Sequence, residues 1–143
     1  MTATTKNRNT QSRGGNRRGY LIGANVRAFA GAIAVLNAAG YCVPATTATG
    51  RIAVGRFAHG LDNTGGADGA ETVEVERGIF RFENSAAGDA IGLADIGKRC
   101  YLVDDQTVAK THGTNTRSVA GFVDDVDEHG VWVLIDPTSG AAA

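Results

Sequence analysis

Three histidines are the side chains of this sequence best suited to acid–base or metal chemistry near neutral pH. His59, His112 and His129 each precede a glycine, in segments predicted to be turns or strand ends. None has a partner residue at the spacing of a metal site or of a nucleophile–base pair, and no Gly-x-Ser-x-Gly turn marks a nucleophile. We therefore predict no catalytic residue, no metal site and no bound cofactor, and we expect that the protein is not an enzyme.

Acidic residues form two groups that could bind a cation through carboxylate oxygens. One is Asp104 with Asp105, and the other is Asp124 with Asp125 and Asp127. Neither group has the alternating spacing of a calcium loop, and acidic side chains in predicted hairpin turns are ordinarily solvated. We interpret both groups as surface turns.

Two cysteines, Cys42 and Cys100, stand far apart in the chain. They have neither a Cys-x-x-Cys spacing nor a cluster of histidines nearby, so buried thiols are the simplest interpretation. The sequence is also compatible with a disulfide between them.

The chain has 143 residues, the size of one ordinary domain, and its 20 glycines and two prolines suit short strands joined by glycine turns. Its apolar stretches are too short to span a membrane, and its first residues lack the apolar stretch of a secretory signal. We expect a soluble protein that is made in a cytoplasm.

The net charge of −1 conceals an uneven distribution, because residues 1–19 are basic and the rest of the chain is acidic. This segment contains no large apolar side chain, so by itself it should be disordered. It could bind nucleic-acid phosphates, lie across the acidic surface of a partner subunit, or remain a solvated tail without a role. Its five cations are Lys6, Arg8, Arg13, Arg17 and Arg18.

The segment that most clearly predicts a strand is residues 71–82, ETVEVERGIFRF. Val73 and Val75 alternate with glutamates, but after Gly78 the phase shifts, and Phe80 and Phe82 take the even positions. A β-bulge near Gly78 would keep all four apolar side chains on one buried side of a bent strand. The alternative is two separate strands that meet at Gly78.

Further strands are predicted on both sides of this segment. Residues 20–44 have a partly helical apolar pattern, but a turn at 37–40 favours two strands, and residues 51–59 form another. Residues 61–70 should be a mobile surface loop, because they are rich in glycine, aspartate and asparagine. Two hairpins follow, at 99–110 and 118–135, and residues 138–143 should fray.

The last predicted strand, VWVLI, is apolar on both faces, so the rest of the domain or another subunit should cover both of them. Strands every ten or so residues predict an all-β fold, a small antiparallel β-barrel or sandwich that carries a disordered or extended basic N-terminal arm. The predicted domain covers residues 20–137. Glutamates on the central strand and the small number of aromatic residues argue against nucleic-acid binding by this domain.

Two blocks of the sequence, residues 63–82 (NTGGADGAETVEVERGIFRF) and 97–110 (GKRCYLVDDQTVAK), resemble the head decoration proteins of tailed bacteriophages, also called structural cement or capsid fibre proteins. The resemblance extends from about residue 26 to residue 137, and residues 1–19 lie outside it. It implies a β-barrel-like protein on the outer surface of the virion, made in the host cytoplasm. Its partner would be the major capsid protein, commonly with the decoration protein present as a homotrimer.

This resemblance leads to two predictions about individual residues. The basic arm, with Lys6, Arg8, Arg13, Arg17 and Arg18, should order on binding and pair with acidic residues of the capsid. Val131, Trp132 and Leu134 should contribute to the interface of the trimer. The alternative function is that of a nucleic-acid-binding β-barrel that uses the basic arm, although nucleic acid is the less expected partner.

Overall fold

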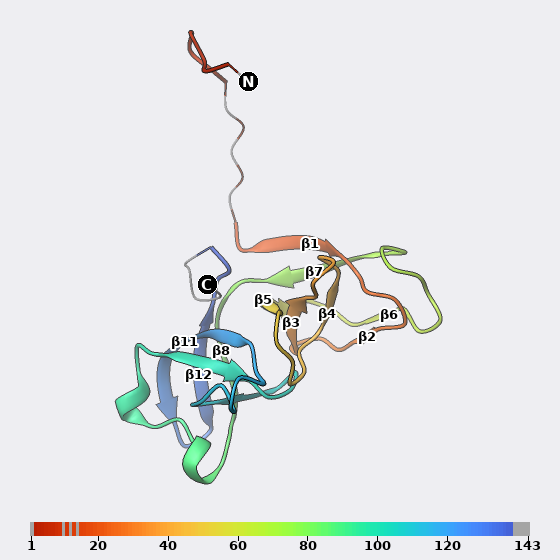
Figure 1. Cartoon of the computed structure of the whole chain (residues 1–143). Helices are drawn as coiled ribbons and strands as arrows, with labels where there is room; N and C mark the ends of the chain where they lie inside the picture. Colours follow the sequence, from red (N-terminus) through yellow and green to blue (C-terminus); the bar gives the residue numbers. More distant parts are fainter. Residues whose placement is uncertain (1, 10, 12, 14, 139–143) are drawn as a thin grey trace.

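The computed structural model describes residues 2–9, 11, 13 and 15–138, and shows an all-β chain with two short 3₁₀ turns (Figure 1). The predicted fraying of the C-terminus therefore falls almost entirely outside the described residues. The strands are β1 (Arg17–Leu21), β2 (Arg27–Ala28), β3 (Ile33–Leu36), β4 (Cys42–Pro44), β5 (Ile52–Phe57), β6 (Leu61–Asp62), β7 (Thr72–Glu76), β8 (Gly78–Asn84), β9 (Arg99–Leu102), β10 (Thr107–Ala109), β11 (Val119–Asp127) and β12 (Gly130–Ile135). The 3₁₀ turns are η1 (Ala87–Asp89) and η2 (Leu93–Asp95).

The first half of the chain forms an open sheet with the strand order β1-β7-β5-β3-β4, in which every pair is antiparallel. The short strands β2 and β6 pair with each other beside it. The predicted hairpin at residues 37–40 is confirmed, since β3 pairs with β4 and the Asn37 side chain accepts the backbone N–H groups of Ala39 and Tyr41.

The second half closes into a five-stranded barrel with the order β10-β8-β12-β11-β9. Both predicted C-terminal hairpins are confirmed, as β9 pairs with β10 and β11 with β12. Closure requires one parallel pair, between β10 and β8. The predicted all-β fold with a small, mainly antiparallel barrel is therefore confirmed. Strand β11 continues to Asp127, so Asp124, Asp125 and Asp127 lie on a strand and not in a turn.

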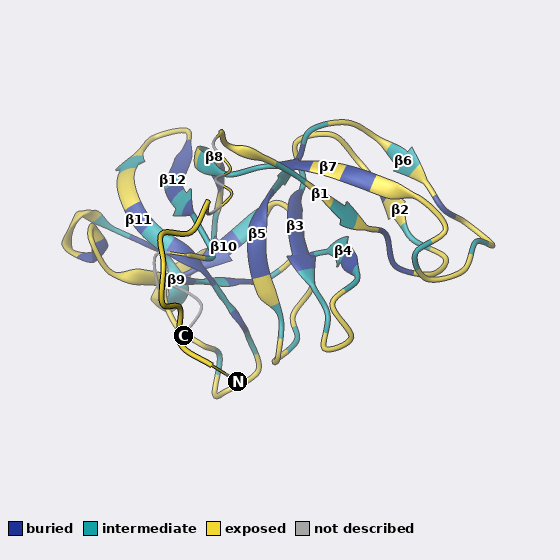
Figure 2. Ribbon diagram, turned by 90° about the horizontal axis from the view of Figure 1, so that it is seen from above, coloured by how far each residue is buried: buried dark blue, intermediate teal, exposed yellow. Residues whose placement is uncertain are grey.

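Two apolar cores are built from these elements. The inner faces of the barrel form one core, which also takes in Ile33, Val35 and Ala53 from the open sheet. Ala34, Val54 and Phe57 belong to the other core, which lies within the first half of the chain. Alternate residues of β3 and β5 thus enter different cores, which explains why these central strands are apolar on both faces. Figure 2 shows their buried residues between the barrel and the outer strands.

The predicted bent strand at residues 71–82 is wrong, and the alternative of two strands is correct. Val73 and Val75 on β7 are buried in the core of the open sheet, whereas Phe82 on β8 is buried in the barrel core. The chain leaves one sheet after Glu76 and enters the other at Gly78, whose φ of 151° favours glycine. The change of phase marks a change of sheet, and each half faces its own core.

The loop at residues 61–70 is more closely attached to the body than predicted. It begins with β6, and the side chain of Asn63 is buried and donates to the carbonyl oxygens of Gly23 and Ala67. The Asp68 carboxylate accepts the backbone N–H of Ala24. Hydrogen bonds to the segment after β1 therefore hold the loop against the sheet.

Candidate functional site

The predicted basic arm divides into two structurally different parts. Lys6, Arg8 and Arg13 are exposed residues that precede β1 in the chain. Arg17 and Arg18 lie on β1, so the last three residues of the predicted arm belong to the open sheet. Residues 17–19 were predicted to be disordered, but backbone hydrogen bonds with β7 order them as part of β1.

Arg17 forms ion pairs within the chain, so it belongs to the sheet and not to a disordered arm, while its contact with a partner stays a prediction. Its guanidinium lies 3.2 Å from the Glu74 carboxylate and 2.9 Å from that of Glu76. Arg56 approaches Glu76 from the neighbouring strand at 3.5 Å. The glutamates that made this sheet look acidic are therefore balanced by arginines on adjacent strands. Arg18 donates to the carbonyl oxygens of Arg17 and Gly15.

The three residues predicted for the subunit interface lie in different environments. Val131 is fully buried in the barrel core, so its side chain cannot contribute to a contact between subunits. This is a correction, because the alternation of β12 turns Val131 inward and its neighbour outward. Trp132 and Leu134 are half-buried on the outside of the barrel.

Leu134 belongs to an outward-facing apolar row on the barrel. Residues directly opposite each other in antiparallel strands point to the same side of a sheet. Leu134 stands opposite Phe122 of β11 and Ile79 of β8, and the Ile79 side chain is 46% exposed. Phe122, Leu134 and Ile79 form the apolar row, which crosses three strands.

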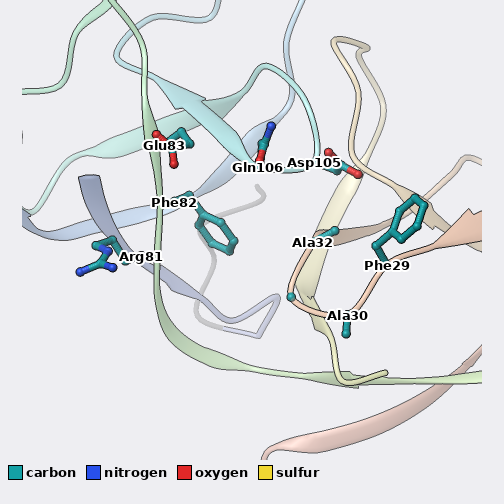
Figure 3. Close-up of a pocket in the computed structure, with 9 residues that line it drawn as sticks. Phe29, Ala30, Ala32, Arg81, Phe82, Glu83, Asp105 and Gln106 are labelled. Carbon is teal, nitrogen blue, oxygen red and sulfur yellow. The ribbon is translucent and has the colours of Figure 1, made fainter. Parts of the chain in front are cut away.

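Two adjoining hollows, of about 570 and 430 Å³, lie between the turn after β2 and strand β8. They share Gly31, Arg81 and Phe82, so together they form one groove along β8, which we call the β8 groove. In the larger hollow, Phe29 lies on one side and Phe82 on the other (Figure 3). The smaller hollow extends the groove toward Trp132.

Arginines stack on aromatic rings in and beside the β8 groove. The guanidinium carbon of Arg56 lies 4.2 Å from the centre of the Phe80 ring, and that of Arg81 lies 5.6 Å from the Trp132 ring. Arg27 stacks on Phe29 at 5.0 Å. Such cation–π contacts place each guanidinium over a ring, and Arg27 and Arg56 also pair with the carboxylates of Asp62 and Glu76.

The other end of the groove carries the acceptors Glu83, Asp105 and Gln106. Burial, followed by the neighbouring charge of Asp104, raises the pKa of Asp105. The backbone carbonyl of Asp105 accepts the N–H of Ile33 at 2.7 Å, which joins this turn of the barrel to the open sheet. The groove therefore has a half with stacked arginines and a half with acidic and amide groups.

The candidate metal and acid–base residues lie in separate places. His59 Nε2 accepts the backbone N–H of Glu74, and His112 Nδ1 accepts that of Asn115. His129 lies at the β11–β12 turn, 3.3 Å from Glu128. Among the described residues, no three histidine, cysteine, aspartate or glutamate side chains gather closely enough to hold a metal ion. The absence of an enzymatic activity stays a prediction.

Both cysteines are free thiols, as the simplest interpretation of the sequence predicted. Cys42 lies in the core of the open sheet, whereas Cys100 lies in the barrel core. Burial raises the pKa of each thiol to about 12, which makes both unreactive in the folded state.

Sequence reasoning missed the β8 groove because its residues are far apart in the chain. The sequence did contain one signal for the groove: arginine and phenylalanine occur close together twice, in residues 27–29 (RAF) and in residues 77–82 (RGIFRF). No local pattern indicates that Phe29 and Trp132 both line a groove beside β8. Only the junction between the sheet and the barrel brings them together.

Comparisons of the chain with protein-family models, with curated protein sequences and with solved structures find no match. In the described part of the chain, no helix has the length and apolar character needed to cross a membrane.

Proposed function

We propose that this protein is a bacteriophage capsid decoration protein. It binds the outer surface of the shell of major capsid protein and stabilises that shell against the pressure of packaged DNA. The resemblance of residues 63–82 and 97–110 to head decoration proteins is the origin of the proposal. The all-β body suits such a role, because a protein that only adds contacts between shell subunits needs a stable framework and adhesive surfaces.

The observation that most directly supports the proposal is the apolar row on the outside of the barrel. Ile79, Leu134 and Phe122 place partly exposed apolar side chains on three neighbouring strands. This row is a candidate contact surface for a homotrimer, in place of the set that included Val131. Trp132 lines the β8 groove and lies at the boundary of this surface.

The exposed segment before β1 supplies the second adhesive element of the proposal. Lys6, Arg8 and Arg13 can pair with acidic residues of the shell once the segment orders on contact. Each contact is weak alone, but three copies of the segment in a trimer bind with a high effective concentration. The same segment could bind nucleic acid, so nucleic-acid binding is the alternative that the tests must separate.

A direct test uses shells assembled from the major capsid protein that accompanies this chain in its phage. We expect saturable co-sedimentation of the full chain with these shells and a rise in their melting temperature. Absence of binding to intact shells would contradict the proposal. Binding to single-stranded dT30 with a steep loss of affinity as salt increases would instead favour the nucleic-acid alternative.

The proposed trimer contact is tested with Leu134→Glu. Sedimentation equilibrium should show a trimer for the full chain and a monomer for this variant, because a charge would be buried in an apolar contact. The matched control is Leu93→Glu, since Leu93 is 74% exposed on η2 and lies outside the apolar row. If the full chain is a monomer, or both variants behave alike, the apolar row is not the contact.

The role of the segment is tested by deleting residues 2–15. This deletion leaves β1 intact, including the ion pairs of Arg17 with Glu74 and Glu76. We expect weaker binding to shells and an unchanged melting temperature of the free protein. Unchanged shell affinity would exclude the segment from the binding surface.

A further inference from the structure

We propose that the β8 groove binds an extended acidic segment of a partner protein, which adds as a strand to the unpaired edge of β8. Three features of the groove point to this occupant: the backbone of the edge, the exposed apolar side chains beside it, and the arginines of the smaller hollow. This inference does not depend on the proposed shell binding, because it concerns a groove of the free protein.

One side of β8 is paired along most of the strand, whereas the other side is paired only at its end. Strand β12 pairs with β8 as far as Phe82, but β10 pairs with it only from Glu83 onward. The Glu83 N–H donates to the carbonyl oxygen of Gln106, on the β10 side. Since the backbone groups of alternate residues in a strand point the same way, those of Ile79 and Arg81 also point away from β12. In the part of the chain that the structure describes, no strand pairs with them on that side.

The hollows lie along this unpaired edge. The smaller hollow is lined by Ile79 and Arg81, which are exposed on the outer face of β8, and also by Phe80 and Phe82, which pack toward the barrel core. A hollow that touches residues of both faces of a strand lies at the edge of that strand. The edge from Ile79 to Glu83 is about 13 Å long at about 3.3 Å per residue, so about four residues of an added strand fit beside it.

Exposed apolar side chains lie beside the unpaired edge. Phe29, 57% exposed, lines the larger hollow, and Ile79, 46% exposed, lines the smaller one. The Gly31 N–H donates to the carbonyl oxygen of Phe57 at 2.9 Å, which fixes the wall opposite β8 to the open sheet. Alternate side chains of an added strand point to opposite faces, so they can pack against this wall and against β8. The groove therefore offers both the backbone and the apolar contacts that strand addition uses.

The arginines of the smaller hollow select an acidic segment. Arg56 and Arg81 line this hollow, and no carboxylate does. Arg56 shares the Glu76 carboxylate with Arg17, whose guanidinium is the nearer, at 2.9 Å against 3.5 Å. Arg81 stacks on Trp132 and, among the described residues, has no carboxylate within ion-pair distance. An aspartate or glutamate of the partner, opposite Arg81, would complete a charge-assisted contact.

The larger hollow restricts where the partner can carry negative charge. Glu83 and Asp105 line it together with Gln106, so the part of the segment that lies there should be uncharged or basic. A nucleic acid would place a phosphate beside these carboxylates at every nucleotide. Phosphates also only accept hydrogen bonds, whereas the edge of β8 presents both N–H donors and C=O acceptors. A peptide backbone supplies a partner for each.

The test is an NMR titration of the full chain with the capped peptide acetyl-GSTVEVTSG-amide, whose sequence is the same in both directions. We expect saturable shifts of the Gly31, Ile79 and Arg81 amides, and hydrogen exchange at Ile79 and Arg81 that slows about tenfold or more. In the free protein these two amides should exchange faster than those of Phe80 and Phe82, which face β12. No shift at about 1 mM peptide, or slow exchange in the free protein, would overturn the proposal. Slow exchange that increases with protein concentration would show that a second copy occupies the edge instead.

Three altered peptides separate strand addition from other modes of binding. Replacing the central glutamate by lysine should weaken binding at least tenfold, because the charge then repels Arg56 and Arg81. The other two carry one backbone N-methyl group, on the glutamate or on the valine after it. Only one of these N–H groups faces β8 in an added strand, so one peptide should bind and the other should not. If both bind, or neither does, strand addition is contradicted.

The partner charge is tested with Arg81→Glu. This exposed substitution should weaken binding of the glutamate peptide at least tenfold and strengthen binding of the lysine peptide. Its control is Lys98→Glu, which makes the same change of charge at an exposed position outside the groove. Equal changes in both variants would contradict the assignment. Tighter binding of dT12 than of the glutamate peptide at the same amides would identify a nucleic-acid site and overturn the proposal.

Discussion

The open sheet and the barrel solve the same problem of backbone pairing in different ways. The barrel closes on itself, so each of its five strands has a partner on both sides, although β10 pairs with β8 only at Glu83 and Asn84. The sheet ends at β1 on one side and at the three-residue strand β4 on the other. Arginines protect the β1 edge, since charged side chains discourage further strand pairing. The barrel should therefore be the more stable of the two regions.

The composition of the two cores also indicates that the sheet is the less independent region. Every buried residue of the core within the open sheet comes from residues 22–75, whereas the barrel core also takes in Ile33, Val35 and Ala53 from that sheet. The sheet thus uses the barrel to cover one of its faces. Its central strands would expose apolar side chains without that cover, so we expect the sheet to depend on the barrel for its stability.

The largest expected effect comes from glycines at which another strand passes closely. A Cβ at Gly55 would overlap the backbone of Glu76, and a Cβ at Gly121 would overlap that of Leu134. Gly55→Ala in the sheet and Gly121→Ala in the barrel should each lower the free energy of unfolding by about 4 kcal/mol or more. Urea denaturation measures this. Gly88→Ala, which has open space around it, is the matched control and should be nearly neutral.

The dependence of the sheet on the barrel is tested with Ile33→Ala. Ile33 is fully buried where the two regions meet, and its truncation should cost about 2–5 kcal/mol. Trp132 fluorescence, which reports on the barrel, and far-UV circular dichroism should give the same transition midpoint. Ile52→Ala, at a 44% exposed position on β5, is the control and should change stability little. A far-UV signal that persists after the Trp132 transition in Ile33→Ala would mean that the sheet does not depend on the barrel.

The two buried thiols measure how often each region opens. Because burial raises both thiol pKa values to about 12, a thiol reagent at pH 8 reacts only after local opening. Each thiol is measured in the variant that lacks the other one, Cys42 in Cys100→Ala and Cys100 in Cys42→Ala. Cys42 lies on an edge strand of the sheet and should react about tenfold faster, which corresponds to a difference of about 1.4 kcal/mol in the free energy of local opening. Equal rates would show that both regions open as one unit.

The smallest effect is expected at the junction, with Asp105→Asn. Burial and the charge of Asp104 raise the pKa of Asp105 in the folded state, so its ionised form opposes folding. The substitution should stabilise the protein slightly at pH 7, and the gain should vanish as the pH falls below the usual aspartate pKa, where the carboxyl is protonated in both states. Thermal unfolding at pH 7 and pH 3 measures it. Asp124→Asn is the control at an exposed position. An equal gain in stability from this substitution would show that burial of Asp105 is not the cause.

Local sequence patterns predicted most of the secondary structure. Alternation identified β5, β7 and β8, and turn residues located the hairpins β3–β4, β9–β10 and β11–β12. The basic segment was also evident, because composition needs no tertiary context. Such patterns depend on residues a few positions apart, so a sequence displays them directly.

The tertiary structure decided which strands share a core. The phase change at Gly78 was visible, but a bulge and a change of sheet produce the same local pattern. The outcome depended on long-range partners, since β7 pairs with β1 and β5 while β8 pairs with β10 and β12.

Local sequence patterns also could not predict which side chains form a surface together. Arg17 looked like part of a free arm until its pairing with Glu74 and Glu76 placed it in the sheet. Val131 looked like an interface residue until barrel closure turned it inward. The sequence by itself determined the strands, their turns and a basic N-terminal segment. Pairing and closure determined which side chains reach the surface together, because these contacts join residues that are distant in the chain.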